Sequence, residues 1–311
     1  MSASSRIEAG DAADPTRIRS RGLGRQSFTR LRREKLTLGA LFVLLAIFAA
    51  GALAPEIAPY GFGHLDLRPN QELQPPTLAG RHFFGTDDIG HDLFSETLYG
   101  VRTSAEIALS VAVLAGLLGT LVGAIAGYCG GWLDSVLMRI VDFVMTLPVL
   151  AVLLASIVFA PQMHLTPLVV AVVLTLYMWT SVARVVRVSF AALREVPFVE
   201  AARAMGASPA RVIVRHMLPN SFGPIIVAAT ALIGQAILLE ATVEYFNYGV
   251  SSLLRPSLGN LVADSTKAGL DLAHWWLFAL PAVVIVVMIG CANFVADSLD
   301  EALNPASARK G

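Results

Sequence analysis

Residues 200–209 read Glu-Ala-Ala-Arg-Ala-Met-Gly-Ala-Ser-Pro, and the polar stretch runs on to His216-Met217-Leu218-Pro219-Asn220. Apolar segments long enough to cross a bilayer as helices, about 20 residues each, lie on both sides of it. The stretch carries far more charge than either neighbour. We therefore read it as a polar connection between two membrane spans, and the rest of the fold is laid out around it.

Composition indicates an all-α polytopic membrane protein. The chain has 311 residues, of which 55% are hydrophobic and 15% charged, and its mean hydropathy is +0.65. Soluble domains usually carry about a quarter charged residues. The short alternating segments of a β-barrel are absent. The formal net charge is zero, and nothing beyond a basic N-terminus supports nucleic-acid binding.

Six apolar segments are expected to span the membrane as helices. They cover residues 36–54, 104–128, 136–160, 167–185, 222–248 and 275–296. Four regions follow from this pattern: a basic tail (1–35), the first span with a large loop (36–103), a helical core (104–297) and a C-terminal tail (298–311). Within the core, a polar loop covers about 187–220.

Charge sets the orientation, because cytoplasmic loops are rich in arginine and lysine. Residues 1–35 hold nine basic residues against four acidic ones, whereas residues 55–100 hold seven acids against two basic residues. The connection from Arg184 to Arg215 holds six arginines against two glutamates. Both termini and the polar connection are therefore expected in the cytoplasm.

The polar connection predicts two short helices. The first covers about 197–205 and stops at Gly206, which tolerates positive φ. The second starts with Ser208 as N-cap and Pro209 at its first position, and ends before Pro219. Arg203 is placed to pair with Glu200. The small residues that follow Glu200 would let another surface approach the first helix closely.

Local patterns make further predictions about the spans. Gly116, Gly119, Gly123 and Gly127 lie near one face of their helix, which favours close helix packing in lipid. Arg139 and Asp142 are spaced to meet on one helix face. Pro148 is expected to kink the third span. A short re-entrant or interfacial helix is expected near residues 257–260.

Acidic and polar residues in the large loop and the fifth span are open to two interpretations. Asp87, His91 and Asp92 fit either a divalent metal site or a turn with Thr86 or Asp87 as helix cap. Within the fifth span, Gln235, Glu240 and Glu244 are candidates for a translocation path, because intramembrane acids are usually functional. The alternative for Glu244 is a solvated position at the headgroup level.

The motifs that would make this chain an enzyme are absent. It has no Walker-type phosphate loop, no Gly-x-Ser-x-Gly elbow and no His-Glu-x-x-His. Cys129 and Cys291 lack metal-type spacing, so two unpaired thiols are expected. We expect no catalytic residue, metal or cofactor in this chain itself.

The motifs taken together resemble the second (C-type) permease subunit of dipeptide, oligopeptide and nickel ABC importers. Glu-Ala-Ala followed by Gly206 and Leu218-Pro219 resembles the family's cytoplasmic coupling loop. Phe84-Gly85-Thr86-Asp87, Gly130-Gly131-Trp132 and Asn304-Pro305 resemble its other motifs, over about residues 31–305. Departures lie on the external side. They are His91 for a usual arginine, Glu244, Tyr245 and Asn247 in a usually small and apolar run, and Arg255 and Ser257 in a usually proline-rich loop.

The resemblance implies a type I ABC importer permease in a bacterial or archaeal cell membrane. It implies as partners a homologous permease, two cytoplasmic ATPases that bind ATP and Mg²⁺, and an extracytoplasmic solute-binding protein. The residues it assigns to ATPase coupling are Glu200, Ala201, Ala202, Arg203, Gly206, Leu218 and Pro219. Peptide cargo is implied first, with nickel or another small solute as the alternative. A proton-coupled secondary transporter using Glu240 and Glu244 is the rival class, although inverted repeats are not evident.

Overall fold

The computed structural model describes residues 35–65, 72–77, 82–152, 155, 166–246, 255–267 and 272–303. The longer helices are α2 (Lys35–Ala52), α4 (Leu93–Cys129), α5 (Gly131–Thr146), α7 (Pro167–Arg194), α11 (Phe222–Tyr245), α12 (Leu258–Lys267) and α13 (Trp275–Leu303). The shorter ones are α3 (Ala54–Ile57), α8 (Pro197–Ala204), α9 (Pro209–Val212), α10 (Leu218–Asn220) and the 3₁₀ turn Leu272–His274. A π-helical turn, Ile213–Met217, joins α9 to α10.

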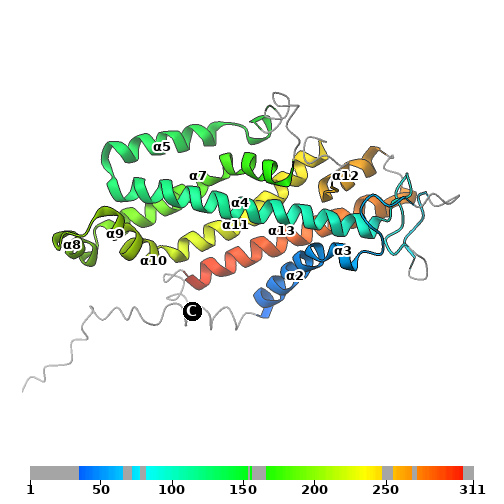
Figure 1. The fold of residues 1–311 in the computed structure, drawn as a ribbon, viewed down its shortest axis with the longest axis horizontal. Helices are drawn as coiled ribbons and strands as arrows, with labels where there is room; N and C mark the ends of the chain where they lie inside the picture. Colours follow the sequence, from blue (N-terminus) through cyan, green and yellow to red (C-terminus); the bar gives the residue numbers. More distant parts are fainter. Residues whose placement is uncertain are drawn as a thin grey trace, which may run out of the picture.

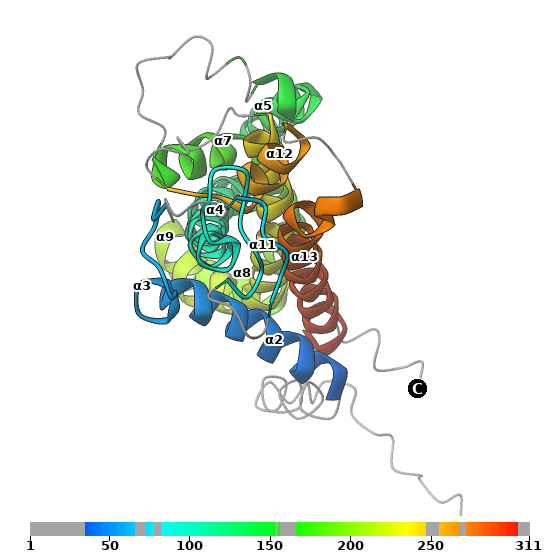
Figure 2. The ribbon, with the colours of Figure 1, turned by 90° about the vertical axis from the view of Figure 1, so that its right-hand side faces the viewer.

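The helices form one elongated bundle with two distinct ends (Figure 1). One end, here called the α8 end, carries α8, α9 and α10. The other, the α12 end, carries α3, α12 and the loop that precedes α4. The end-on view in Figure 2 shows α4 inside the bundle, with α7, α11, α13 and α2 around it. α4 thus runs between the two ends and packs on α7, α11 and α2, whereas α13 packs on α11 and α2.

Five of these helices are long and apolar enough to cross a membrane: α2, α4, α7, α11 and α13. They match five of the six predicted spans, and no strand occurs in the described part of the chain. The third predicted span is represented by α5, which has only 16 residues. Much of residues 153–165 lies outside the described residues, as do residues 1–34 and 304–311, so the count of six spans and the side of each terminus stay predictions.

Proline ends α5 where a kink was expected. The helix stops at Thr146, and Leu147 adopts an extended conformation with φ −73° and ψ 132°. Residues before a proline avoid the helical region, because the proline ring clashes with their backbone. Pro148 therefore interrupts the helix, which resumes over residues 149–152, so the kink predicted at this proline takes the form of a break.

Glycines let α4 and α7 pack backbone to backbone. Gly119, Gly123 and Gly127 follow one another at four-residue steps on the face of α4 that meets α7. A Cβ at these three positions would lie 2.5, 2.5 and 2.6 Å from the carbonyl oxygens of Trp179, Ala183 and Arg187, respectively. Gly116 meets α11 instead, where a Cβ would touch Ala229 at an ordinary 3.6 Å. The predicted packing role is confirmed, and it matters because lipid supplies no hydrophobic force between helices.

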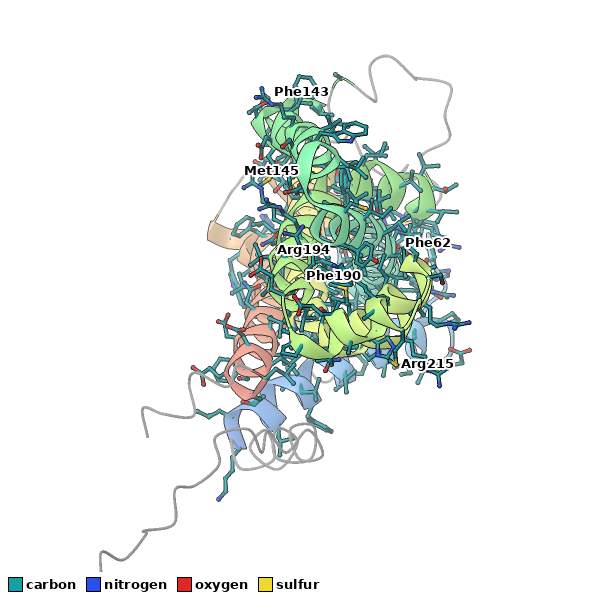
Figure 3. The ribbon with its side chains drawn as sticks, turned by 90° about the vertical axis from the view of Figure 1, so that its left-hand side faces the viewer. Phe62, Phe143, Met145, Phe190, Arg194 and Arg215 are labelled. Atoms are coloured by element: carbon teal, nitrogen blue, oxygen red, sulfur yellow. The ribbon has the colours of Figure 1, made fainter. Side chains whose placement is uncertain are left out.

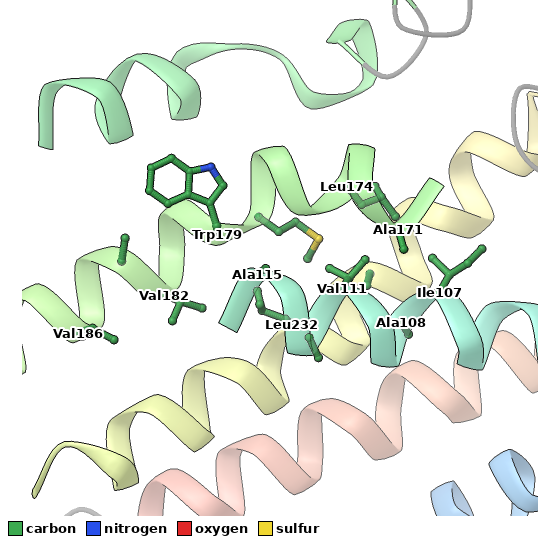
Figure 4. Close-up of a cluster of buried hydrophobic side chains, with 14 of the residues drawn as sticks. Ile107, Ala108, Val111, Ala115, Ala171, Leu174, Trp179, Val182, Val186 and Leu232 are labelled. Carbon is green, nitrogen blue, oxygen red and sulfur yellow. The ribbon is translucent and has the colours of Figure 1, made fainter. Parts of the chain in front are cut away.

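Large side chains fill the space beside these glycines (Figure 4). The buried set includes Ile107, Val111, Leu174, Val182, Val186 and Phe190. At the lower edge of the bundle, α2 meets α13 through a polar contact, because the Thr37 hydroxyl donates to Ser298 Oγ at 2.9 Å. Hydrogen bonds of this kind hold helices together in an apolar medium.

The start of α4 differs from the sequence prediction. Its N-cap is Asp92, whose carboxylate accepts hydrogen bonds from the Ser95 amide at 2.8 Å and the Ser95 hydroxyl at 2.7 Å. Thr86 and Asp87 were predicted as caps, yet they lie further back in the loop. The helix begins eleven residues before the expected span, because Asp92 supplies the acceptor that its first amides need.

Candidate coupling site

The polar connection forms a compact helical unit at the α8 end (Figure 3). Figure 3 labels Arg194 and Arg215 at this end. α8 begins after Val196 with Pro197 at its first position, where a missing amide hydrogen is harmless. Its bounds agree with the predicted first helix to within one residue.

Gly206 ends α8 in the conformation that the sequence predicts. Its φ is +80°, and its amide donates to the Arg203 carbonyl at 2.9 Å. The amide of Ala207 then donates to the Ala202 carbonyl at 3.1 Å. This pair of bonds is a Schellman motif, which satisfies carbonyls that would otherwise be orphaned at the helix end. A residue with a Cβ would be strained at this position.

α8 presents most of its predicted coupling residues to the outside. Glu200, Ala201, Arg203 and Gly206 are exposed, and Met205 is 82% exposed at the tip. Ala202 is the exception, because it is 3% exposed and packs inward with Val199. Ala202 therefore holds α8 against the bundle, while the other four residues form an open face.

Arg203 anchors α8 to the end of α4. Its guanidinium carbon lies 4.6 Å from the centroid of the Tyr128 ring. The pair predicted between Arg203 and Glu200 is therefore wrong, and the carboxylate of Glu200 remains on the exposed face. The contact of Arg203 with Tyr128 was not predicted from the sequence, because a cation–π contact across 75 positions leaves no local pattern.

The second short helix is less regular than predicted. Ser208 occupies the N-cap position, but its side chain makes no capping hydrogen bond. α9 lasts only to Val212, and the chain then widens into the π-turn Ile213–Met217 before α10. Pro219, expected to lie beyond the helix, is inside α10.

The π-turn accommodates this proline. A proline inside a helix has no amide hydrogen and its ring crowds the carbonyl four residues earlier, which a wider turn relieves. The side chain of Asn220 reaches back and donates to the His216 carbonyl at 2.6 Å. Leu218 is half-buried and Pro219 is exposed. The chain passes through Ser221 directly into α11, so α9, the π-turn, α10 and α11 form one nearly continuous helical piece.

Arginines of α7 fasten α5 beside this unit. Nε and Nη2 of Arg187 donate to the two carboxylate oxygens of Asp134, at 2.7 and 2.6 Å. These hydrogen bonds hold the pKa of the Asp134 carboxyl below its usual range. Arg184 donates to Asp142 at 2.6 Å. The predicted Arg139–Asp142 pair is therefore wrong, because Asp142 has a partner on the neighbouring helix.

The candidate metal residues do not form one cluster. Asp87 accepts from the amides of Ile89 and His91, and its second oxygen lies 2.7 Å from Nδ1 of His91. Asp92 turns the other way, toward Nδ1 of His82 at 2.8 Å. Within the described residues, no group of three or more candidate ligands comes together. The loop therefore carries hydrogen-bonded turns and a helix cap.

The predicted translocation residues lie in different environments. Gln235 is exposed on α11. Glu240 and Glu244 are both fully buried, one helical turn apart, where α11 meets α4 and α12. Burial of Glu244 contradicts the solvated headgroup position considered from the sequence. α12 itself confirms the short helix expected near residues 257–260.

Comparisons with known proteins agree with this architecture. Residues 119–309 match the family model described as "Binding-protein-dependent transport system inner membrane component". Residues 22–76 match the "N-terminal TM domain of oligopeptide transport permease C". The chain resembles the inward-facing MetNI methionine ABC transporter in fold. The TM-score is 0.55 and the sequence identity 19%, over 68% of this chain and 98% of that one.

Curated relatives align over nearly their whole length. The oligopeptide transport system permease protein OppC of Mycobacterium tuberculosis (strain ATCC 25618 / H37Rv) is 35% identical over 280 residues, which is 89% of this chain and 93% of the relative. The dipeptide transport system permease protein DppC of Bacillus subtilis (strain 168) is 31% identical over 294 residues, or 94% and 89%.

The fold and these matches define the class of protein as a membrane-embedded permease subunit of a type I ABC importer. More particularly, the chain belongs to the family of binding-protein-dependent transport system inner membrane components. The predicted class and the predicted all-α fold of a type I ABC importer permease are thereby confirmed.

Proposed function

We propose that this chain is the translocation subunit of an ATP-driven importer of di- or oligopeptides. It would pair with a homologous permease in a bacterial or archaeal cell membrane. Two cytoplasmic ATPase subunits, which hold ATP and Mg²⁺, would drive it, and an extracytoplasmic solute-binding protein would deliver the cargo. The relatives named above for oligopeptide and dipeptide transport support the cargo.

The observation that carries the proposal is the open face of α8. Glu200, Ala201, Arg203 and Gly206 project from a capped helix at one end of the bundle. Two attachments support that helix: the Arg203–Tyr128 contact to α4, and the continuous path through the π-turn into α11. A partner that pushes this face would move both helices together, as a rigid-body transition requires.

Two substitutions test this assignment in the reconstituted transporter. Glu200→Lys reverses the charge of the face, and Gly206→Val strains the positive-φ helix stop. Both substitutions should uncouple ATP hydrolysis from transport. ATP hydrolysis should no longer respond to loaded binding protein, and peptide uptake should fall. Unchanged ATPase binding and unchanged uptake in both variants would show that α8 is not the coupling element.

Gly131→Val is the matched control for backbone strain. Gly131 also has positive φ, +59°, a Cβ added there would meet nothing within 4 Å, and the residue lies in the α4–α5 turn. A general loss of stability caused by valine at positive φ should appear in Gly131→Val as much as in Gly206→Val. Uncoupling of ATP hydrolysis from uptake should appear only in Gly206→Val. Uptake driven by a proton gradient without ATP would instead support a secondary transporter.

A further inference from the structure

Glu240 occupies a closed junction of three helices near the α12 end. Its side chain is 0% exposed, and its Oε2 accepts a hydrogen bond from the Ser104 hydroxyl of α4 at 2.9 Å. Its Oε1 has no hydrogen-bond partner among the described residues. One turn further along α11, Glu244 is also fully buried.

The first turn of α12 closes this junction. A Cβ at Gly259 would lie 2.5 Å from the Ala241 carbonyl oxygen and 2.7 Å from Cβ of Glu244. On its other side, the start of α12 meets α4, since a Cβ at Gly100 would lie 3.1 Å from the Leu258 amide nitrogen. α12 is therefore wedged between α4 and α11 and covers the turn that carries the two acids.

Within the described part of the chain, no positive charge acts on Glu240; the ionisable group that acts on it is the carboxyl of Glu244. On α4, Arg102 and Glu106 point to a half-exposed face, where Glu106 also binds Arg255. On α12, Asp264 is exposed.

Other helices that pack on α11 add no charge here. Asp297, Asp300 and Glu301 of α13, and Arg184, Arg187 and Arg194 of α7, belong to the ends of these helices near α8. At the opposite end of α13, His274 contacts the ring of Trp276. Glu96, two turns before Ser104 on α4, accepts from the Gly63 amide.

A buried carboxylate next to a second buried acid is strongly disfavoured. Loss of hydration and repulsion act in the same direction, and one hydrogen bond from a hydroxyl does not offset both. Binding a proton removes the charge and turns one carboxyl oxygen from an acceptor into a donor.

We infer that Glu240 is a proton-binding site, and that the bound proton keeps α12 docked between α4 and α11. Release of the proton leaves a charged carboxylate that is stable only in contact with water. The start of α12 covers the turn that carries this carboxylate, so α12 has to move away before water can hydrate it. A cavity of about 480 Å³ lies next to this turn and is lined by Glu96, Pro256, Asn260, Leu261 and Asp264, among others.

The site would make the outer end of the transporter sensitive to external pH. Only this regulatory consequence rests on the proposed transport function. The proton site itself concerns one subunit at rest, and its test needs neither cargo nor ATP. Failure of the proton site therefore leaves the transport assignment standing, and the reverse also holds.

Hydrogen exchange of α12 in the assembled transporter tests the inference. If docking requires one proton, the opening equilibrium of Leu258–Lys267 should rise about tenfold per pH unit once Glu240 titrates. In Glu240→Gln this pH dependence of opening should vanish. Intrinsic base catalysis of exchange is the same in both proteins, so the ratio of wild-type to variant exchange rates at each pH reports only the opening equilibrium. A constant ratio between about pH 5 and about pH 9 would overturn the inference.

Two neighbouring substitutions should shift the transition in opposite directions. Ser104→Ala removes a hydrogen bond that favours the carboxylate, so opening should begin at higher pH. Glu244→Gln removes the repelling charge, so opening should begin at lower pH. A merely structural junction would lose protection at every pH in both variants, without a shift in the midpoint.

Infrared spectroscopy supplies an independent readout that does not depend on stability. The wild-type transporter at neutral pH should show the carbonyl band of a protonated carboxylic acid, and Glu240→Gln should lose it. Glu106→Gln is the control, because Glu106 is half-exposed and paired with arginines. Persistence of the band in Glu240→Gln would exclude Glu240 as the proton carrier.

Discussion

The guanidinium of Arg203 lies over the ring of Tyr128, 4.6 Å from its centroid, and ties α8 to the last turn of α4. Contacts of this kind are worth about 0.5–1 kcal/mol at exposed sites. This free energy is small compared with the stability of the whole bundle. It nevertheless stabilises the position of α8, the helix that a partner would push under the proposed function.

Tyr128→Leu should therefore loosen α8 without unfolding the protein. We expect hydrogen exchange in Pro197–Ala204 to rise about two- to fivefold, as a loss of about 0.5–1 kcal/mol implies. Uptake per ATP hydrolysed should fall in parallel. Tyr128→Phe keeps the ring and should behave like wild type. Equal effects of Phe and Leu would point to the tyrosine hydroxyl instead.

Gly123→Ala should destabilise the bundle much more than Gly116→Ala, although both glycines lie on α4. The added methyl meets the Ala183 carbonyl at 2.5 Å in the first case and an ordinary 3.6 Å contact in the second. Overpacking of this kind costs about 1–3 kcal/mol. Thermal unfolding in detergent compares the two, and similar midpoints would mean that α4 and α7 separate easily.

Asn220→Ala should weaken the π-turn before α11, because the His216 carbonyl loses its donor. A lost hydrogen bond of this type costs about 1 kcal/mol. The expected result is faster exchange in residues 213–221 with an intact α11. Asn220→Gln retains a donor on a longer side chain and tests whether the donor matters. The role of this hydrogen bond would be contradicted if Asn220→Ala left the exchange unchanged, or if Asn220→Gln raised it as much as Asn220→Ala.

His91 should confer a pH-dependent stability on the loop that precedes α4. Its hydrogen bond to Asp87 raises the pKa of the imidazole, despite partial burial. The stabilisation is thus fully present below the unfolded pKa, about 6.5, and is lost as pH rises through the higher folded pKa. Limited proteolysis of the loop should accelerate over that range.

His91→Gln should abolish this pH dependence of proteolysis. The matched control is His64→Gln, in the same loop region, where the imidazole stacks on Tyr60. If His64→Gln removed the dependence and His91→Gln preserved it, the assignment to His91 would be wrong.

Features set by the local chain were predictable from the sequence. Long apolar runs, the glycine face of α4, Gly206 and Pro197 each act through neighbours a few positions away, and the structure agrees with them. Gly206 could be anticipated because a helix stop with positive φ favours a residue without a Cβ.

Partners far apart in the chain were not predictable in this way. Asp142 had a plausible partner at Arg139, yet Arg184 of α7 offers a better-placed donor. Arg203 likewise contacts Tyr128 rather than Glu200. Tertiary packing decided the cap of α4 too, since Asp92 is held by His82 as well as by Ser95. Local spacing ranks such partners poorly because many side chains come within reach only when helices meet.

The passage from α10 into α11 has a consequence for communication across the membrane. α11 has 24 residues, so it extends for about 36 Å, from the π-turn at one end to Glu240 and the α12 wedge at the other. A stiff rod transmits displacement in both directions. By reciprocity, if α11 couples the two ends, a partner that binds α8 would change the docking equilibrium of α12 by the same factor as docking of α12 changes the affinity of that partner.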